Sequence, residues 1–511
     1  MAAVRGLTLI LILATFACKP TEAAPTRAPI GHGDAEEPPP TAASVVPQVT
    51  PPSPLPDDVT ARIDRIVADI RPADGGPPQT LADRMAAADV PGLAIAVVDD
   101  YQVQWVRGFG VRHAEHDVPV DERTLFQVGA ISTTVTTAAI LRMQQAGKLD
   151  LDRDIAETMR SWTLRADDGW TPRVSLRALL THTAGLPEID LVGIRPGDPT
   201  PPLAHWLDRA DGGAPVTVRR VPGLQTFPSD AGAVVAQVVI ADAIEVDFAA
   251  AMNDWILQPA AMTDSTFAQP LPLAHLPFAS TAHPADAVPL AAGFDAYPQQ
   301  AAAGLWTTAT DLGAFVAAVL RSVAGYEDAL LPPDAVAEMM TPIAAGTGLG
   351  VQLWGDPLRW SQSGTTHGFS AELVAFTGGG QGAIVLANAS ATGPLRQAVF
   401  DAIAREYQWA EATSEAPAAP PVKELQRLAG VYVIDGAGEI ELAVDGDGLA
   451  LSIPGQAPLR LRSIGEDTFE AVGVQLWVDV QRNGRRVTGL ALDQGLGPVL
   501  ARPRASTSTS P

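Results

Sequence analysis

The sequence predicts an α+β fold, with an antiparallel sheet flanked by helices, followed by a small all-β domain. Residues 90–98 and 102–110 are expected to be two core strands that pair as a hairpin. From residue 440 onward the apolar residues recur with a period of two, which indicates half-buried strands. A proline- and alanine-rich segment at 411–422 separates the two patterns, so we expect two folded domains joined by a linker.

The N-terminus has the pattern of an export signal. Arg5 precedes a mostly apolar run of eleven residues at 7–17, which is signal-peptide length and too short to span a bilayer. Cys18 follows, and residues 1–18 resemble a bacterial lipoprotein signal, in which this cysteine becomes the lipidated first residue. The alternative is ordinary cleavage near Ala23, which would discard Cys18. We therefore expect a lipid-anchored protein on the periplasmic side of the bacterial cell envelope.

Residues 19–58 are rich in proline, alanine and threonine, and such a composition cannot bury a core. This segment therefore predicts a semi-extended tether. Apolar residues at helical spacing then predict a first helix at 59–70.

Composition limits the classes of function. The chain has 511 residues, of which 47% are hydrophobic, and this is enough for a large core and for more than one domain. The net charge of −24 disfavours nucleic-acid partners, because phosphate binding needs clusters of Lys and Arg. The single cysteine excludes an internal disulfide framework. No cofactor is expected.

The strongest functional signal lies at 126–141. This segment closely resembles the nucleophile segment of the serine β-lactamase and penicillin-binding-protein family, which usually begins Phe-x-Ile-Gly-Ser-Val-Thr-Lys. Laid over it without gaps, Ala130 takes the place of the nucleophilic serine and Thr133 takes the place of the lysine. A serine hydroxyl needs a neighbouring base, and a lysine three residues later lies on the same helical face. Alanine has no oxygen for attack, and threonine is no base at neutral pH.

Two further motifs of that family depart in the same way. The resemblance places a Tyr-x-Asn motif after a Pro-Gly turn, but here Pro228 replaces the tyrosine and Asp230 the asparagine. A Lys-Thr-Gly or His-x-Gly motif is expected on a core strand, where Gln362 stands in place of the cation and Gly364 is kept. Joint loss of three motifs argues for a site that is no longer used for acyl transfer.

The scaffold nevertheless resembles the family from about residue 59 to 410. The resemblance implies the β-lactamase/transpeptidase-like fold with a mostly helical subdomain. The middle of the chain, at about 155–300, is expected to be mixed and mostly helical, and the proline-rich stretches at 196–202 and 270–277 predict loops. Gly147 is expected to cap the nucleophile-type helix. Segments that match in order are 90–98, 102–110, 146–152, 179–187, 259–267, 303–312, 348–351 and 384–388. Later elements are expected as a helix at 309–321, strands at 348–354, 370–376 and 382–388, and a helix at 394–408.

Beyond the linker, residues 423–504 predict a small antiparallel β barrel or sandwich, similar to the β domain often appended to this family. Alternating apolar residues flank the turn at 445–448, and a second hairpin signal lies at Asn483-Gly484. Residues 505–511 predict a polar tail.

Several polar residues could belong to a remodelled pocket. We expect His182 to be part of a structural turn, as in the family. Asp230 either faces a polar cleft or is an ordinary loop carboxylate in solvent. His367 lies on the loop that borders the pocket, and the backbone amide of Ala130 could still form half an oxyanion hole. The other candidates for this cleft are Ser132, Thr133, Ser229 and Gln362. One carboxylate without histidines at ligand spacing argues against a metal site.

Three functional hypotheses follow from these patterns. The first is an exported pseudoenzyme that binds a cell-envelope ligand, such as a peptidoglycan fragment, or an envelope protein. The second is a hydrolase, an esterase, peptidase or β-lactamase-like enzyme, that uses a displaced group such as Ser132 or Asp230. The third is a structural lipoprotein whose fold serves only as a spacer.

Overall fold

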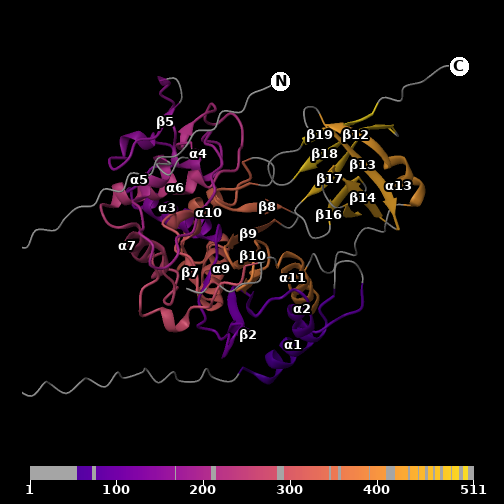
Figure 1. Ribbon diagram of the computed structural model, residues 1–511, viewed down its shortest axis with the longest axis horizontal. Helices are drawn as coiled ribbons and strands as arrows, with labels where there is room; N and C mark the ends of the chain where they lie inside the picture. Colours follow the sequence, from indigo (N-terminus) through magenta and orange to yellow (C-terminus); the bar gives the residue numbers. More distant parts are fainter. Residues whose placement is uncertain are drawn as a thin grey trace, which may run out of the picture. The chain divides into compact units, whose positions relative to one another are not determined.

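The computed structural model describes residues 55–71, 76–166, 169–208, 214–284, 290, 293–343, 347–354, 358–390, 392–409, 421–434, 438–446, 448–454, 458–463, 467–471, 476–484, 486–493 and 499–504 (Figure 1). Cys18, the tether up to residue 54, most of the linker and the tail lie outside these ranges. No helix within them is long and apolar enough to cross a membrane.

The centre of the main domain is a seven-stranded sheet in the order β3-β2-β1-β11-β10-β9-β8. Neighbouring strands pair antiparallel throughout, as the sequence predicts. The strands are β1 Gly92–Asp99, β2 Gln102–His113, β3 His116–Pro119, β8 Gln352–Trp354, β9 Arg359–Thr366, β10 Phe369–Phe376 and β11 Gln381–Ala387.

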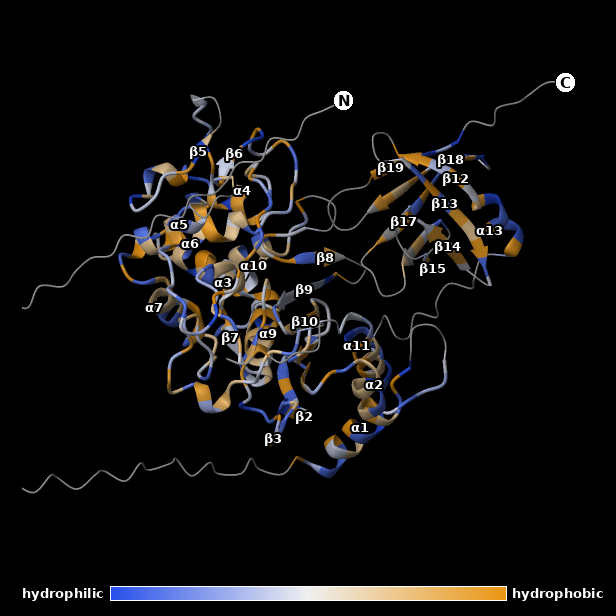
Figure 2. Ribbon diagram, in the orientation of Figure 1, coloured by the Kyte–Doolittle hydropathy of each residue, from blue (hydrophilic) through white to orange (hydrophobic). Residues whose placement is uncertain are grey.

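Both faces of this sheet are buried at its central strands β1, β10 and β11, which explains the continuous apolar run in β1. Ala94, Ala96 and Val98 pack into one core, whereas alternate residues Leu93 and Ile95 pack into another. Helices α1 (Asp57–Ala68), α2 (Leu81–Ala87) and α11 (Gly393–Tyr407) lie together on the second face (Figure 1). In Figure 2, α1 alternates between hydrophilic and hydrophobic colours, as expected for a helix with one buried side.

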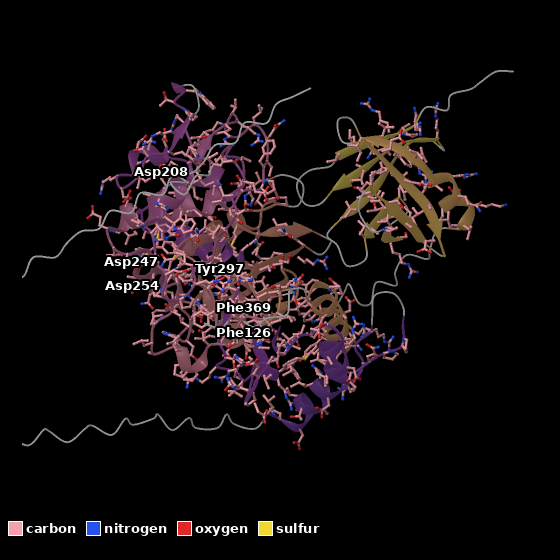
Figure 3. The ribbon with its side chains drawn as sticks, in the orientation of Figure 1. Phe126, Asp208, Asp247, Asp254, Tyr297 and Phe369 are labelled. Atoms are coloured by element: carbon pink, nitrogen blue, oxygen red, sulfur yellow. The ribbon has the colours of Figure 1, made fainter. Side chains whose placement is uncertain are left out.

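The first face carries α9 (Ala309–Val323) and the larger core around α3 (Ile131–Gln145), in which Phe126 and Phe369 are fully buried (Figure 3). Gly147 follows α3 at a φ of +67°, which confirms the expected C-terminal cap. The predicted strand at 348–354 begins only at Gln352, because Gly350 turns the chain at a φ of +67°.

The region 155–300 is less helical than predicted, and helices make up less than half of its described residues. Proline has no N–H and a fixed φ, and it interrupts this region repeatedly. The predicted loops at 196–202 and 270–277 are largely irregular, and the latter ends in a short 3-10 turn. The helices are α4 Leu176–Leu180, α5 Leu203–Asp208, α6 Ala231–Ile244, α7 Phe248–Met252 and α8 Gln300–Ala303, and α10 Pro333–Met339 follows later.

The C-terminal region is a closed barrel of strands β12 to β19, preceded by α13 (Val422–Leu428). Closure depends on pairing of β12 with β19, which leaves no exposed sheet edge. The alternating residues Ile440 and Leu442 point into its core, as predicted. The strands are β12 Gly430–Ile434, β13 Gly438–Asp445, β14 Gly448–Ser452, β15 Leu459–Ser463, β16 Thr468–Ala471, β17 Trp477–Asn483, β18 Arg486–Asp493 and β19 Val499–Pro503.

Candidate functional site

The site is organised around the start of α3, a helix that is buried on nearly every side. Ala130 is its N-cap residue and is half-buried. A methyl group is therefore the only side chain at the position where the family resemblance expects an attacking hydroxyl. The Ala130 carbonyl is occupied too, because it accepts a hydrogen bond from Nε2 of Gln362 at 3.3 Å.

Thr133 and Gly364 complete the packing around this helix start. The Thr133 hydroxyl donates to the carbonyl of Ala301 in α8 at 3.2 Å, so it links two helices. A Cβ added at Gly364 would lie 2.0 Å from the Val128 carbonyl oxygen and 2.6 Å from the Ala130 nitrogen. Strand β9 therefore approaches the start of α3 backbone to backbone, and only glycine fits at this point.

Ser132 faces the protein interior. Its side chain is fully buried, and its hydroxyl accepts a hydrogen bond from the Leu305 backbone N–H at 3.1 Å. It is not among the residues that line the pocket described below.

Ser229 and His182 form a structural turn. The Ser229 hydroxyl donates to the Pro187 carbonyl, and its backbone N–H donates to Nδ1 of His182 at 3.2 Å. His182 adopts a φ of +56°, and burial lowers the pKa of its imidazole. These contacts agree with the structural role expected for His182, and they place Ser229 outside the pocket lining.

Asp230 lies two residues after Pro228 and is the N-cap residue of α6, but its side chain makes no capping hydrogen bond. Burial, with a smaller contribution from the Glu188 carboxylate, raises the pKa of Asp230 to about 6. Its carboxylate is therefore neither an ordinary loop carboxylate in solvent nor part of the pocket lining.

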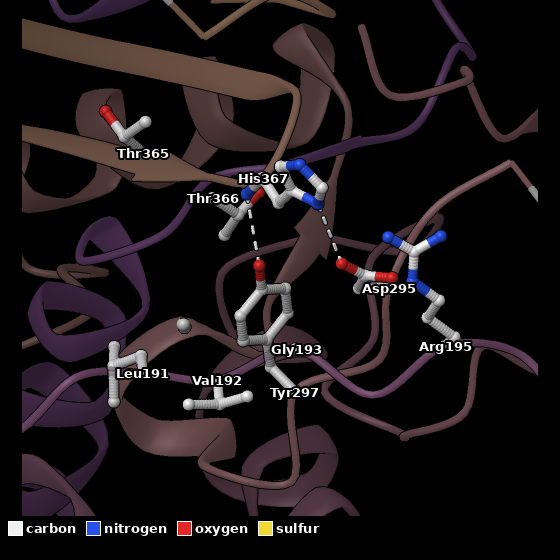
Figure 4. Close-up of a pocket in the computed structure, with 10 residues that line it drawn as sticks. Leu191, Val192, Gly193, Arg195, Asp295, Tyr297, Thr365, Thr366 and His367 are labelled. Carbon is white, nitrogen blue, oxygen red and sulfur yellow. Dashed lines mark hydrogen bonds and ion pairs between the residues drawn. The ribbon is translucent and has the colours of Figure 1, made fainter. Parts of the chain in front are cut away.

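The pocket lies where β9 ends, and its volume is about 490 Å³. His367 lines it, together with two residues that the sequence did not single out, Asp295 and Tyr297 (Figure 4). Nδ1 of His367 lies 3.0 Å from Oδ2 of Asp295, and the His367 backbone N–H donates to the Tyr297 hydroxyl at 3.1 Å. The other lining residues are Leu191, Val192, Gly193, Arg195, Ala303, Thr365 and Thr366.

The polar wall of the pocket is tied to the main sheet. Gln127 donates through Nε2 to the Asp295 carbonyl at 2.6 Å and accepts from the Thr366 hydroxyl at 2.9 Å. Burial raises the pKa of Tyr297 to about 12, so its phenol stays neutral at physiological pH. Among the described residues, no cluster of three or more His, Cys, Asp or Glu could hold a metal ion.

Comparison with known proteins identifies the family. The family model named "Beta-lactamase" matches residues 78–408, which is more than half of the chain. The chain belongs to the beta-lactamase family. Within it, the serine beta-lactamase-like protein LACTB, mitochondrial, of Bos taurus is 30% identical over 96 residues, which cover 19% of this chain and 17% of LACTB. Esterase EstB of Burkholderia gladioli is 32% identical over 94 residues, covering 18% of this chain and 24% of EstB.

The aligned segments thus span less than a quarter of these two curated proteins. Solved structures extend the likeness of fold for this beta-lactamase-family chain. A class C beta-lactamase in complex with cefoxitin has a TM-score of 0.54 and 18% identity, covering 68% of this chain and 99% of the other. SurE with D-Leu has a TM-score of 0.53 and 22% identity, covering 86% and 100%.

Proposed function

We propose that this beta-lactamase-family protein is a catalytically inactive pseudoenzyme, and that it binds a ligand or partner without cutting it. The observation that carries the proposal is Ala130 at the start of α3. In a serine protease, loss of the catalytic serine alone lowers the rate by about 10⁶-fold. The other groups of such a site therefore do not replace an absent nucleophile.

The neighbouring contacts support the same conclusion. The Thr133 hydroxyl and the Gln362 amide each hold a backbone carbonyl, at Ala301 and Ala130 respectively. Groups at the positions of the family base and cation are therefore used in packing rather than presented to a substrate. Each of these substitutions is accommodated within an intact core, which favours a maintained fold over decay.

Covalent labelling of the native chain and a restored variant tests the proposal. The native chain is expected to take up no fluorescent fluorophosphonate, whereas Ala130→Ser combined with Thr133→Lys supplies a nucleophile and a base and is expected to gain labelling. Ala130→Ser alone is the matched control, and it should label far more slowly because it lacks the base. Stoichiometric labelling of the native chain would refute the proposal.

The alternative function is a hydrolase that uses Ser132 or Asp230, and the esterase among the relatives makes ester substrates the natural choice for its test. The burial of Ser132 disfavours attack on a substrate. We expect Ser132→Ala to lower stability by about 1 kcal/mol, because the Leu305 N–H loses its acceptor, without altering any turnover. Turnover of ester and β-lactam substrates that falls in Ser132→Ala or Asp230→Ala would support the alternative instead.

For the setting of this function, we propose export to the periplasmic side of the bacterial cell envelope and a lipid anchor at Cys18. The apolar run at 7–17 followed by the single cysteine supports this. The partner would then be a peptidoglycan fragment or an envelope protein. Metabolic labelling with a fatty acid should mark the native chain and not Cys18→Ser, and equal labelling of both would argue against the anchor.

A role as a mere spacer would be disfavoured by saturable uptake of any defined ligand.

A further inference from the structure

The pocket beside His367 is a preformed cavity built from three chain segments. Ile194 and Ala296 exchange two backbone hydrogen bonds of 2.8 Å, so the 191–195 loop is fixed to the 295–297 segment. A Cβ at Gly193 would lie 2.6 Å from Cβ of Asp295, which shows how closely these two segments pack. The bond from the His367 N–H to the Tyr297 hydroxyl joins the same segment to the end of β9. The cavity therefore needs little ordering when a ligand binds.

One side of this cavity carries a cation, the guanidinium of Arg195. Arg195 is exposed and makes no ion pair or side-chain hydrogen bond with any residue that the structure describes. Figure 4 draws its guanidinium beside the Asp295 carboxylate, but no interaction joins the two. Asp295 engages His367 through Oδ2 only; its Oδ1 is buried and has no hydrogen-bond partner among the described residues, and the side chain is 8% exposed. An arginine left free at the edge of a cavity is a bidentate donor set for a carboxylate.

Another part of the cavity lining is apolar. Leu191, Val192 and Ala303 contribute hydrocarbon surface to it, and Val192 remains 44% exposed although it is a large aliphatic residue. Covering an exposed valine beside a cavity with an apolar group lowers the free energy of the complex, by about 25 cal/mol per Å² of apolar surface buried. The pocket thus joins the Arg195 guanidinium to a short hydrocarbon wall.

We propose that this pocket binds an amphipathic monocarboxylate, with its carboxylate on Arg195 and its hydrocarbon chain along Leu191, Val192 and Ala303. The inference rests on the proposed function, because it names the chemical class of ligand that the pseudoenzyme holds. His367 fixes the polar end of the cavity: Nδ1 faces Asp295, and the half-exposed ring leaves Nε2 available to a ligand hydrogen bond.

Calorimetric titration of the full chain with octanoate and octanamide separates charge from shape. The two probes have nearly the same size, but only octanoate carries the carboxylate. We expect octanoate to bind about tenfold more tightly than octanamide, and Arg195→Ala to abolish that difference. Arg107→Ala is the matched control, since Arg107 is exposed on β2 and does not line the pocket; it should leave both affinities unchanged.

A second arm tests the apolar wall with acetate. Octanoate should bind at least about tenfold more tightly than acetate, and Val192→Ser should reduce that advantage. Equal affinity for octanoate and octanamide, full octanoate affinity in Arg195→Ala, or no octanoate binding overturns the inference. None of these results involves a covalent adduct, so failure here is distinguishable from failure of the pseudoenzyme proposal, which an acylated serine would signal.

Discussion

Gly364→Ala is expected to lower the free energy of unfolding by about 3 kcal/mol or more. The added methyl group would meet the Val128 carbonyl oxygen at 2.0 Å and the Ala130 nitrogen at 2.6 Å. Both contacts are backbone atoms and cannot rotate away, so β9 and the start of α3 must separate. Urea unfolding followed by tryptophan fluorescence measures the change, because Trp360 lies on β9 and is fully buried.

Gly393→Ala is the matched control for this prediction. Gly393 opens α11, and an added Cβ there would meet nothing within 4 Å. Its substitution should change stability by less than about 1 kcal/mol, with a stabilising sign because the unfolded chain loses freedom. If Gly364→Ala proved as stable as this control, the close approach between β9 and α3 would be wrong.

Asp230→Asn is expected to stabilise the protein at neutral pH. The pKa of Asp230 is about 6 in the folded state, above its ordinary value of 3.8, and burial is the main cause. The neutral carboxyl is therefore favoured by folding, and its contribution is fully present below about pH 4 and is lost as pH rises through 6. Asparagine is neutral at every pH and has a similar shape. The gain should grow from near zero below pH 4 to about 3 kcal/mol above pH 7.

Unfolding of both proteins across this pH range measures the effect. Asp311→Asn is an instructive comparison, since burial also raises the pKa of Asp311 to about 6, but its carboxylate accepts from the Ser265 hydroxyl and the Asp264 N–H. Its replacement by asparagine removes acceptor capacity and should not stabilise the protein in the same way. A constant difference between native and Asp230→Asn at all pH values would contradict the assigned burial of Asp230.

Much of the fold was predictable because its signals are local. The apolar run of β1 is continuous since the sheet is covered on both faces, and the period of two around Ile440 matches the inward side of the barrel. Gly147 predicted the end of α3, because glycine favours the left-handed conformation that closes a helix, and its φ is indeed positive. The helical content of 155–300 is lower than predicted, because prolines, which lack an N–H and have a fixed φ, interrupt the region repeatedly.

The pocket was only partly predictable. His367 was found through its closeness to Gly364 in the sequence, and it does line the cavity. Asp295, Tyr297 and Arg195 were missed because they are brought together by the pairing of Ile194 with Ala296, which are far apart in the chain and carry no local pattern. Ser132 and Ser229 looked like pocket residues in the sequence. Both are buried, and their hydroxyls pair with the Leu305 N–H and the Pro187 carbonyl, which are distant in the sequence.

Intact-mass spectrometry of the native chain, after incubation with a penicillin and separately with a fluorophosphonate, tests the central claim most directly. Because Ala130 has no oxygen and Ser132 is buried, the mass is predicted to stay unchanged with both reagents. A stoichiometric adduct that maps to a serine would contradict the account and would make this protein an active acyl-transfer enzyme with a relocated nucleophile.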